Sequence, residues 1–190
     1  MKSARKSGFT LIEMLVALTI FSVVIGAGLN LLIAGIATQK GALAQQKLVD
    51  ETSFVLEYMS RALRQAQVDT LNDCIGAPAR NYELFGGNTG VRFIDGSQLC
   101  REIFLQNGQL LEKISTDHTF GNLPVNGEAL TSNDLSVESI SFSLTGDGGA
   151  DNLQPRLVIS LYVKGLGPQD PSDQPTLRLQ TTLSQRRLDL

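Results

Sequence analysis

The N-terminal part of the chain is a long apolar run with one acidic residue near its start. Residues 14–37 contain no charged residue and no proline. About 20 such residues suffice for a helix to cross the hydrocarbon core of a bilayer, so we expect a membrane-spanning helix over residues 9–37. Glu13 is the exception within it. An acidic side chain costs about 2.5–3.5 kcal/mol near the centre of an inserting helix, and less near its end.

Beyond this run the apolar positions repeat every three or four residues, which predicts an amphipathic continuation of the helix over residues 38–67. Glu57 and Arg61 have the spacing of a helical ion pair. Glycines at 26, 28, 35 and 41 weaken the helix. They could allow a bend or local melting, or equally a close approach of neighbouring helices. The apolar face consists of Leu48, Thr52, Val55, Leu56, Met59, Leu63 and Ala66.

The helical repeat ends after Gln67. Residues 69–90 are rich in Asn, Gly, Asp and Pro, and this composition predicts a long connector. Segments with strand-like composition follow, and the Asn107-Gly108 pair predicts a tight hairpin turn between two of them. The expected strands are 91–95, 100–106, 109–115, 135–145, 157–164 and 176–186.

Alternating apolar and polar residues at 139–144 and 157–163 predict an antiparallel sheet that covers the helix with one face. The predicted fold class is therefore α+β: a long N-terminal helix, transmembrane in its first half, packed on a mainly antiparallel β-sheet. Residues 68–190 form the β-rich globular domain in this prediction.

Three basic residues, Lys2, Arg5 and Lys6, directly precede the apolar run. By the positive-inside rule they place the N-terminus in the cytoplasm and the β-rich domain outside. A secretory signal also has a basic start, and Gly35-Ile36-Ala37 resembles a cleavage site that would give a chain starting at Thr38. The apolar core of a secretory signal is only about 7–15 residues long, so the length of this run argues against that alternative.

The string G-F-T-L-I-E at residues 8–13, behind a short basic leader and ahead of L-V-A-L-T-I-F-S at 15–22, resembles the signal of type IV prepilins. The resemblance implies a leader, residues 1–8, that prepilin peptidase removes by cutting between Gly8 and Phe9. It also implies N-methylation of Phe9 and assembly of the helix with other pilins or pseudopilins in a filament.

The same resemblance implies a role for Glu13 in filament assembly. The family is thought to pair the new amine at Phe9 of one subunit with this carboxylate on a neighbour. Two charges that would each be costly alone become tolerable as a hydrogen-bonded pair. The alternative is a signal anchor in which Glu13 reaches the membrane surface beside Lys6.

Two further strings, R-A-L-R-Q-A at 61–66 and L-Q-T-T-L-S-Q-R at 179–186, resemble minor pilins of the W type and minor pseudopilins of the J type. Glu13 argues against the tip pseudopilin of the K type, which lacks this acid. We therefore expect a minor pilin-like structural subunit of a type IV pilus-type filament. The alternatives are a J-type pseudopilin of type II secretion and a membrane-tethered adhesin or binding module. The expected location is the inner or cytoplasmic membrane, with a single pass, and then the filament.

Cys74 and Cys100 lie on the predicted external side, where disulfides persist, and we expect them to be bonded. Two independent thiols are the alternative. A bond would contribute about 3 kcal/mol in the loop-entropy model.

Catalytic chemistry is not indicated by the sequence, so we expect no enzyme activity, no cofactor, no metal site and no small-molecule substrate. His118 is the single histidine and lies in a polar segment typical of a solvated loop. The loop with Asp147 and Asp151 lacks the spacing of an EF-hand, and a plain strand connection is favoured over a calcium site.

Charge gives no indication of nucleic-acid binding either. Removal of Lys2, Arg5 and Lys6 from the 16 basic residues leaves 13 against 19 acidic ones, a side-chain charge of −6. A chain with this balance lacks the basic surplus that phosphate backbones attract.

Overall fold

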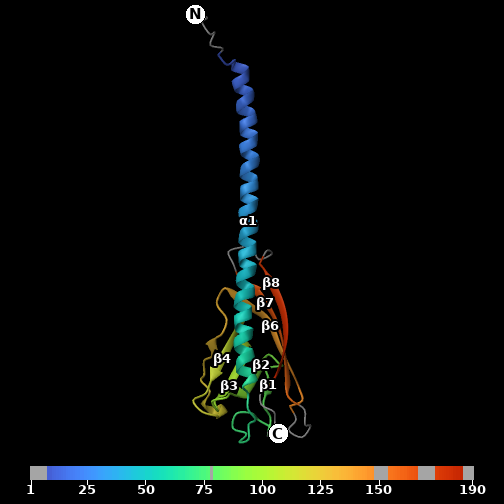
Figure 1. The fold of residues 1–190 in the computed structure, drawn as a ribbon. Helices are drawn as coiled ribbons and strands as arrows, with labels where there is room; N and C mark the ends of the chain where they lie inside the picture. Colours follow the sequence, from blue (N-terminus) through green and yellow to red (C-terminus); the bar gives the residue numbers. More distant parts are fainter. Residues whose placement is uncertain (1–7, 78, 148–153, 167–173, 186–190) are drawn as a thin grey trace, which may run out of the picture. The chain divides into compact units, whose positions relative to one another are not determined.

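The computed structural model describes residues 8–77, 79–147, 154–166 and 174–185. They form one long helix and two antiparallel β-sheets, which confirms the predicted α+β fold class. The chain divides into two compact units, Met1–Leu43 and Ala44–Leu190. The second unit holds the last part of the helix together with both sheets (Figure 1).

The helix α1 spans Leu11–Arg64 and is shorter at both ends than the predicted 9–67. It continues through all four glycines, so these residues do not interrupt it. Shortly after Arg64 the backbone leaves the helix and pairs with the first sheet. The N–H of Gln67 donates to the Ile94 carbonyl of that sheet (2.9 Å). The face predicted to be apolar is the buried one, with Leu48, Thr52, Val55, Met59 and Leu63.

The first sheet has five strands in the order β1-β2-β3-β4-β5. Asn107 and Gly108 both have positive φ (51° and 77°), which confirms the tight turn between β3 and β4. The predicted long connector over 69–90 contains the strand β1, which was not predicted, and β5 was not predicted either. Both strands are very short. The strands are β1 Glu83–Phe85, β2 Gly90–Ile94, β3 Cys100–Gln106, β4 Gln109–Ile114 and β5 Glu128–Ala129, with a short 3₁₀ helix, η1, at Phe120–Asn122 between β4 and β5.

The second sheet consists of β6 (Leu135–Thr145), β7 (Arg156–Gly165) and β8 (Thr176–Ser184), in that order. Figure 1 shows the three strands side by side. Buried and less buried positions alternate along most of β7, as predicted. In β6 a bulge between Val137 and Ser139 shifts the register, so that Val137 and Ile140 both face the core.

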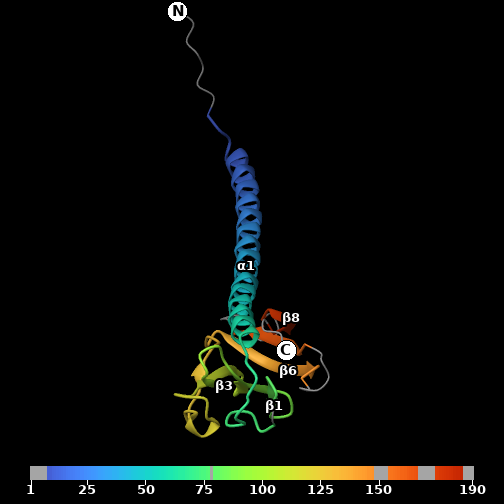
Figure 2. The same ribbon diagram turned by 60° about the horizontal axis from the view of Figure 1, so that its bottom comes forward.

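The two sheets are joined at β6, where the sequence predicted only one sheet. The N–H groups of Val137 and Phe142 donate to the carbonyls of Gly108 (2.7 Å) and Asn88 (2.8 Å), which lie in the hairpin turns of the first sheet. These bonds let one hydrophobic core serve both sheets and the part of α1 from Leu48 to Leu63. Figure 2 shows the end of the helix beside the strands of the second unit. The sheet side of that core includes Val91, Phe93, Ile103, Leu110, Ile140, Phe142, Leu157, Ile159 and Val163.

Candidate processing and assembly site

Gly8 and Phe9 lie outside the helix and are exposed to solvent. Phe9 is 79% exposed, and an added Cβ on Gly8 would meet no atom within 4 Å. The predicted cleavage junction is thus accessible and free of regular secondary structure. Such a junction can enter the active site of a peptidase without unfolding of the helix behind it.

Thr10 caps the N-terminus of α1. Its Oγ1 accepts a hydrogen bond from the Glu13 N–H (3.3 Å), and its carbonyl accepts one from Met14 (3.2 Å). Thr10 and Glu13 have the T-x-x-E spacing of a capping box, in which the side chain at the cap satisfies a free helical N–H. This signal was present in the sequence, but Thr10 was not among the predicted site residues.

The cap places Glu13 in the first turn of α1. The N-terminal end of a helix carries a partial positive charge, which stabilises a carboxylate there. The side chain is exposed, as are the neighbouring residues of the turn. Glu13 therefore lies on the surface of the helix, where a group from another chain can reach it.

The part of α1 in the first unit exposes almost only apolar side chains. It is the one helix among the described residues long and apolar enough to cross a membrane. Its few hydroxyl groups bond to the backbone of the preceding turn, as Thr19 does to Val16 (2.8 Å) and Ser22 to Leu18 (2.8 Å). Polar groups satisfied within the helix can enter lipid at a lower cost. Exposed apolar residues on this stretch include Leu11, Ile12, Leu15, Val16, Leu18, Ile20, Phe21, Val23, Val24, Leu29, Leu31, Leu32 and Ile33.

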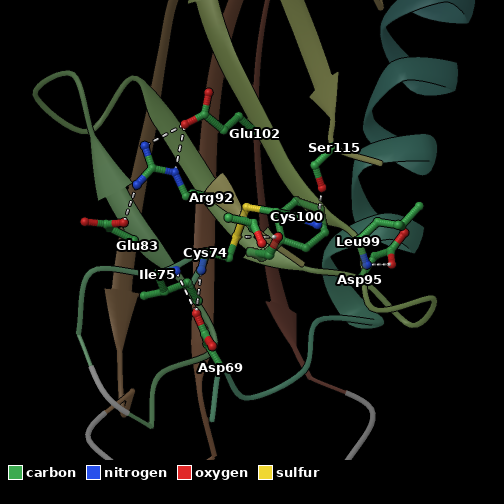
Figure 3. Close-up of a disulfide and its surroundings, with 12 residues drawn as sticks. Asp69, Cys74, Ile75, Glu83, Arg92, Asp95, Leu99, Cys100, Glu102 and Ser115 are labelled. Atoms are coloured by element: carbon green, nitrogen blue, oxygen red, sulfur yellow. Dashed lines mark hydrogen bonds and ion pairs between the residues drawn. A yellow bond between two sulfur atoms is a disulfide. The ribbon is translucent and has the colours of Figure 1, made fainter. Parts of the chain in front are cut away.

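The structure joins Cys74 and Cys100 by a disulfide, as expected from the sequence (Figure 3). Their Cα atoms are 5.6 Å apart, and both residues are buried. The bond ties the segment that follows the helix to the start of β3. The Cys100 N–H also donates to Ser115 Oγ (2.9 Å).

The side chain of Asp69 binds the backbone of the same segment. Its buried carboxylate accepts four backbone N–H bonds, two at each oxygen. Figure 3 shows those from Cys74 (3.0 Å) and Ile75 (2.7 Å). The other two donors are Leu71 and Asn72. Sequence reasoning missed this role, because an aspartate in a loop is common and its donors depend on the local backbone conformation.

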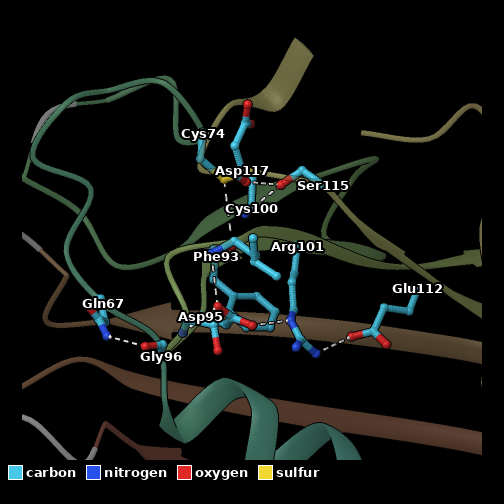
Figure 4. Close-up of polar contacts among 12 residues, drawn as sticks. Gln67, Cys74, Phe93, Asp95, Gly96, Cys100, Arg101, Glu112, Ser115 and Asp117 are labelled. Atoms are coloured by element: carbon cyan, nitrogen blue, oxygen red, sulfur yellow. Dashed lines mark hydrogen bonds and ion pairs between the residues drawn. A yellow bond between two sulfur atoms is a disulfide. The ribbon is translucent and has the colours of Figure 1, made fainter. Parts of the chain in front are cut away.

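Arg101 of β3 lies between two buried carboxylates (Figure 4). Its Nε donates to Asp95 (2.7 Å) and its Nη1 to Glu112 (3.3 Å). Glu112 also accepts a bond from the Tyr58 hydroxyl of α1 (2.5 Å), so this network connects the helix to the first sheet. Burial alone would lower the pKa of Arg101, but the two carboxylates outweigh it and raise that pKa. Burial and the bond to Glu112 raise the pKa of Tyr58.

We expect Tyr58→Phe to lower the free energy of unfolding at neutral pH by about 1.5–3 kcal/mol, the usual contribution of a hydrogen bond to a charged group. In the wild-type chain the raised pKa keeps the folded tyrosine protonated where the unfolded one, with a pKa of about 10, is ionised. That stability is fully present below about pH 10 and is lost as the pH rises through the folded pKa. Urea unfolding of the solubilised chain at neutral and alkaline pH should show a smaller alkaline loss in the variant. Equal losses in the two proteins would contradict this assignment.

Arg92 connects the first sheet to η1. It bonds to Glu83 (2.7 Å) and Glu102 (2.6 Å), and its guanidinium lies 3.8 Å from the ring centroid of Phe120. His118 is partly exposed, as expected for a loop residue, and lies 3.4 Å from an Asp73 oxygen. These contacts hold the loops of the sheet in place.

Among the described residues, no group of three or more His, Cys, Asp or Glu side chains is placed to hold a metal ion. Asp151 lies outside the described part of the chain, and so does most of the loop considered for calcium. Asp147 is described, and its carboxylate accepts a bond from the Asn81 N–H (3.0 Å).

A family model described as the prokaryotic N-terminal methylation motif matches residues 3–29. The match contains the junction, the cap and Glu13, and it supports a type IV pilin-like family. A leader of this kind implies processing by a peptidase and partners from the pilin family. No curated protein and no solved structure matches the chain.

Proposed function

We propose that this chain, which carries the leader of type IV pilin-like proteins, is a minor pilin-like subunit of a type IV pilus-type filament. One observation carries the proposal: Glu13 lies in the first turn of an exposed apolar helix, directly after the Gly8-Phe9 junction. The leader is typical of structural subunits rather than of enzymes. The chain itself would be the substrate of prepilin peptidase.

In this proposal the protein first waits in the cytoplasmic membrane, with its leader inside and the β-rich domain outside. The apolar surface of α1 faces lipid at that stage and the helices of other subunits after extraction. Glu13 would then set the position of each subunit, because its carboxylate has one preferred partner, the amine that cleavage creates on Phe9 of a neighbour. A buried charge pair is well suited to specify register.

The outer domain supports this role through its internal connections. The disulfide and the bond from Tyr58 to Glu112 in the Arg101 network join segments far apart in the sequence, and Asp69 fixes the loop that carries Cys74, as a subunit exposed outside the cell requires. The strings that resemble W-type and J-type subunits overlap the end of α1, at residues 61–64, and β8, at residues 179–184. Both segments contribute to the core or the sheet, and packing can account for their residues. The resemblance therefore does not separate a pilus from a secretion system.

We expect the mature chain to begin with methylated Phe9. Replacement of Gly8 by leucine should block cutting. The leucine side chain would lie directly beside the peptide bond that the peptidase must cut, where glycine has no side chain. Mass spectrometry of the N-terminal peptide from membranes measures both results. Ser3→Ala, in the leader but away from the junction, serves as the control and should be processed normally. A mature chain that starts at Thr38 would overturn the proposal.

A further inference from the structure

The face of the second sheet that points away from the core is polar and carries positive charge. Side chains opposite each other in register share a face of a sheet. One row contains Ser139, Tyr162 and Arg178, and the next contains Ser141, Ser160 and Gln180. Most of these side chains are exposed, while the intervening residues of β7 are buried. The face therefore offers hydroxyl, amide and guanidinium groups to solvent.

These two rows line a groove of about 490 Å³. Ligand pockets in proteins span about 300–1,000 Å³, so the groove is large enough for a small molecule or a segment of a polymer. Apolar residues contribute only Leu161 and Leu179 to its lining. A protein partner usually needs an apolar centre in its interface, and this groove lacks one.

Arg178 lies over an aromatic ring within the groove. Its guanidinium carbon lies 4.5 Å from the ring centroid of Tyr162 on the neighbouring strand. Stacking on an aromatic ring fixes the guanidinium plane and leaves its N–H groups free at the edge, where a carboxylate can accept two bonds. No carboxylate of the described residues forms an ion pair with Arg178.

The charge of the sheet differs from that of the rest of the chain. Strands β6, β7 and β8 carry the cations Arg156, Lys164 and Arg178, whereas their single acidic residue is Glu138, at the bulge. The whole chain has a net charge of −3. The cations are spread out, since Arg156 and Lys164 lie eight residues apart on β7, about 26 Å at 3.3 Å per residue.

We propose that this sheet face binds an acidic polysaccharide of the uronate type. A uronate chain combines widely spaced carboxylates, which suit Arg178 and the two outer cations, with many hydroxyl groups, which suit the serines and Gln180. DNA carries one charge per roughly 1.7 Å of its axis. The charges of a uronate chain are further apart than those of DNA. Three spaced cations on an acidic protein therefore match the uronate chain better than DNA.

Binding of an oligogalacturonate to the solubilised full chain, measured by isothermal titration, tests the proposal. We expect Arg178→Gln to weaken binding about tenfold or more, because a charge-assisted bond contributes about 1.5–3 kcal/mol. Arg178→Lys should lie between this variant and the wild type, since it keeps the charge and loses the planar group. Arg64→Gln is the matched control, because it removes one exposed cation outside the sheet and should bind normally.

Three results would overturn the proposal. The first is unchanged affinity of Arg178→Gln, with circular dichroism showing that the variant is folded. The second is equal binding of a fully methyl-esterified oligogalacturonate, which has the same backbone without the charge. The third is stronger binding of duplex DNA or polyglutamate than of the oligogalacturonate, which would assign the face to another class of polymer.

Discussion

Glu13→Ala should leave the chain in the membrane and reduce its incorporation into filaments by roughly a hundredfold or more. Removal of one partner from a buried charge pair costs about 3–5 kcal/mol, because the other charge remains buried and unpaired. Insertion into the membrane does not need the acid and should become easier without it. The ratio of chain in sheared filaments to chain in membranes, measured by immunoblot, reports both effects.

Glu57→Ala provides the matched control for this experiment. Glu57 is also an exposed acid on α1, but it pairs with Arg61 of the same helix (2.8 Å) in the second unit. Its loss should cost about 0.3–0.5 kcal/mol and leave incorporation unchanged. Normal incorporation of Glu13→Ala would contradict the role given to Glu13, and failure of both variants would point to a general folding defect.

Loss of the disulfide should produce the largest drop in stability. With Cys74→Ser and Cys100→Ser together, we expect a decrease of about 3 kcal/mol in the loop-entropy model, given the sequence separation of 26. For a chain of this size the decrease corresponds to roughly 6–12 °C in the melting temperature. The fold itself should persist, because Asp69 holds the same segment through four backbone bonds.

Thermal unfolding of the solubilised chain, followed by circular dichroism with and without reductant, measures this effect. Reductant should lower the melting temperature of the wild type to that of the double variant and leave the double variant unchanged. Identical melting temperatures for the oxidised wild type and the variant would show that the bond contributes no stability.

Segments with strong local patterns were predicted well from the sequence. The observed bounds of β3 and β6 are those predicted, because each is long and bounded by turn residues. Strands β1 and β5 have only three and two residues. They form because they pair with neighbouring strands, and their composition alone does not predict them. The division into two sheets depends on bonds to Gly108 and Asn88 from distant residues, which no local pattern encodes.

The candidate site shows the same difference between local patterns and contacts of distant residues. The segment with Gly8, Phe9 and Glu13 is contiguous, so a motif could identify it. The bond from Tyr58 to Glu112 joins residues 54 positions apart, and only the folded chain brings them together. Arg178 is one of several exposed cations in the sequence, and its stacking on Tyr162 depends on the register of β7 and β8.

The end of α1 determines how the second unit would carry a mechanical load. The Leu63 carbonyl accepts a bond from the Tyr82 hydroxyl (2.6 Å), just before β1, and the Ala66 carbonyl accepts one from the Gln185 side chain (2.8 Å), just after β8. Each bond leads to a different sheet, and β6 connects the two sheets. Tension applied along the helix would therefore load both sheets at once, so that many hydrogen bonds must fail together before either sheet can peel away.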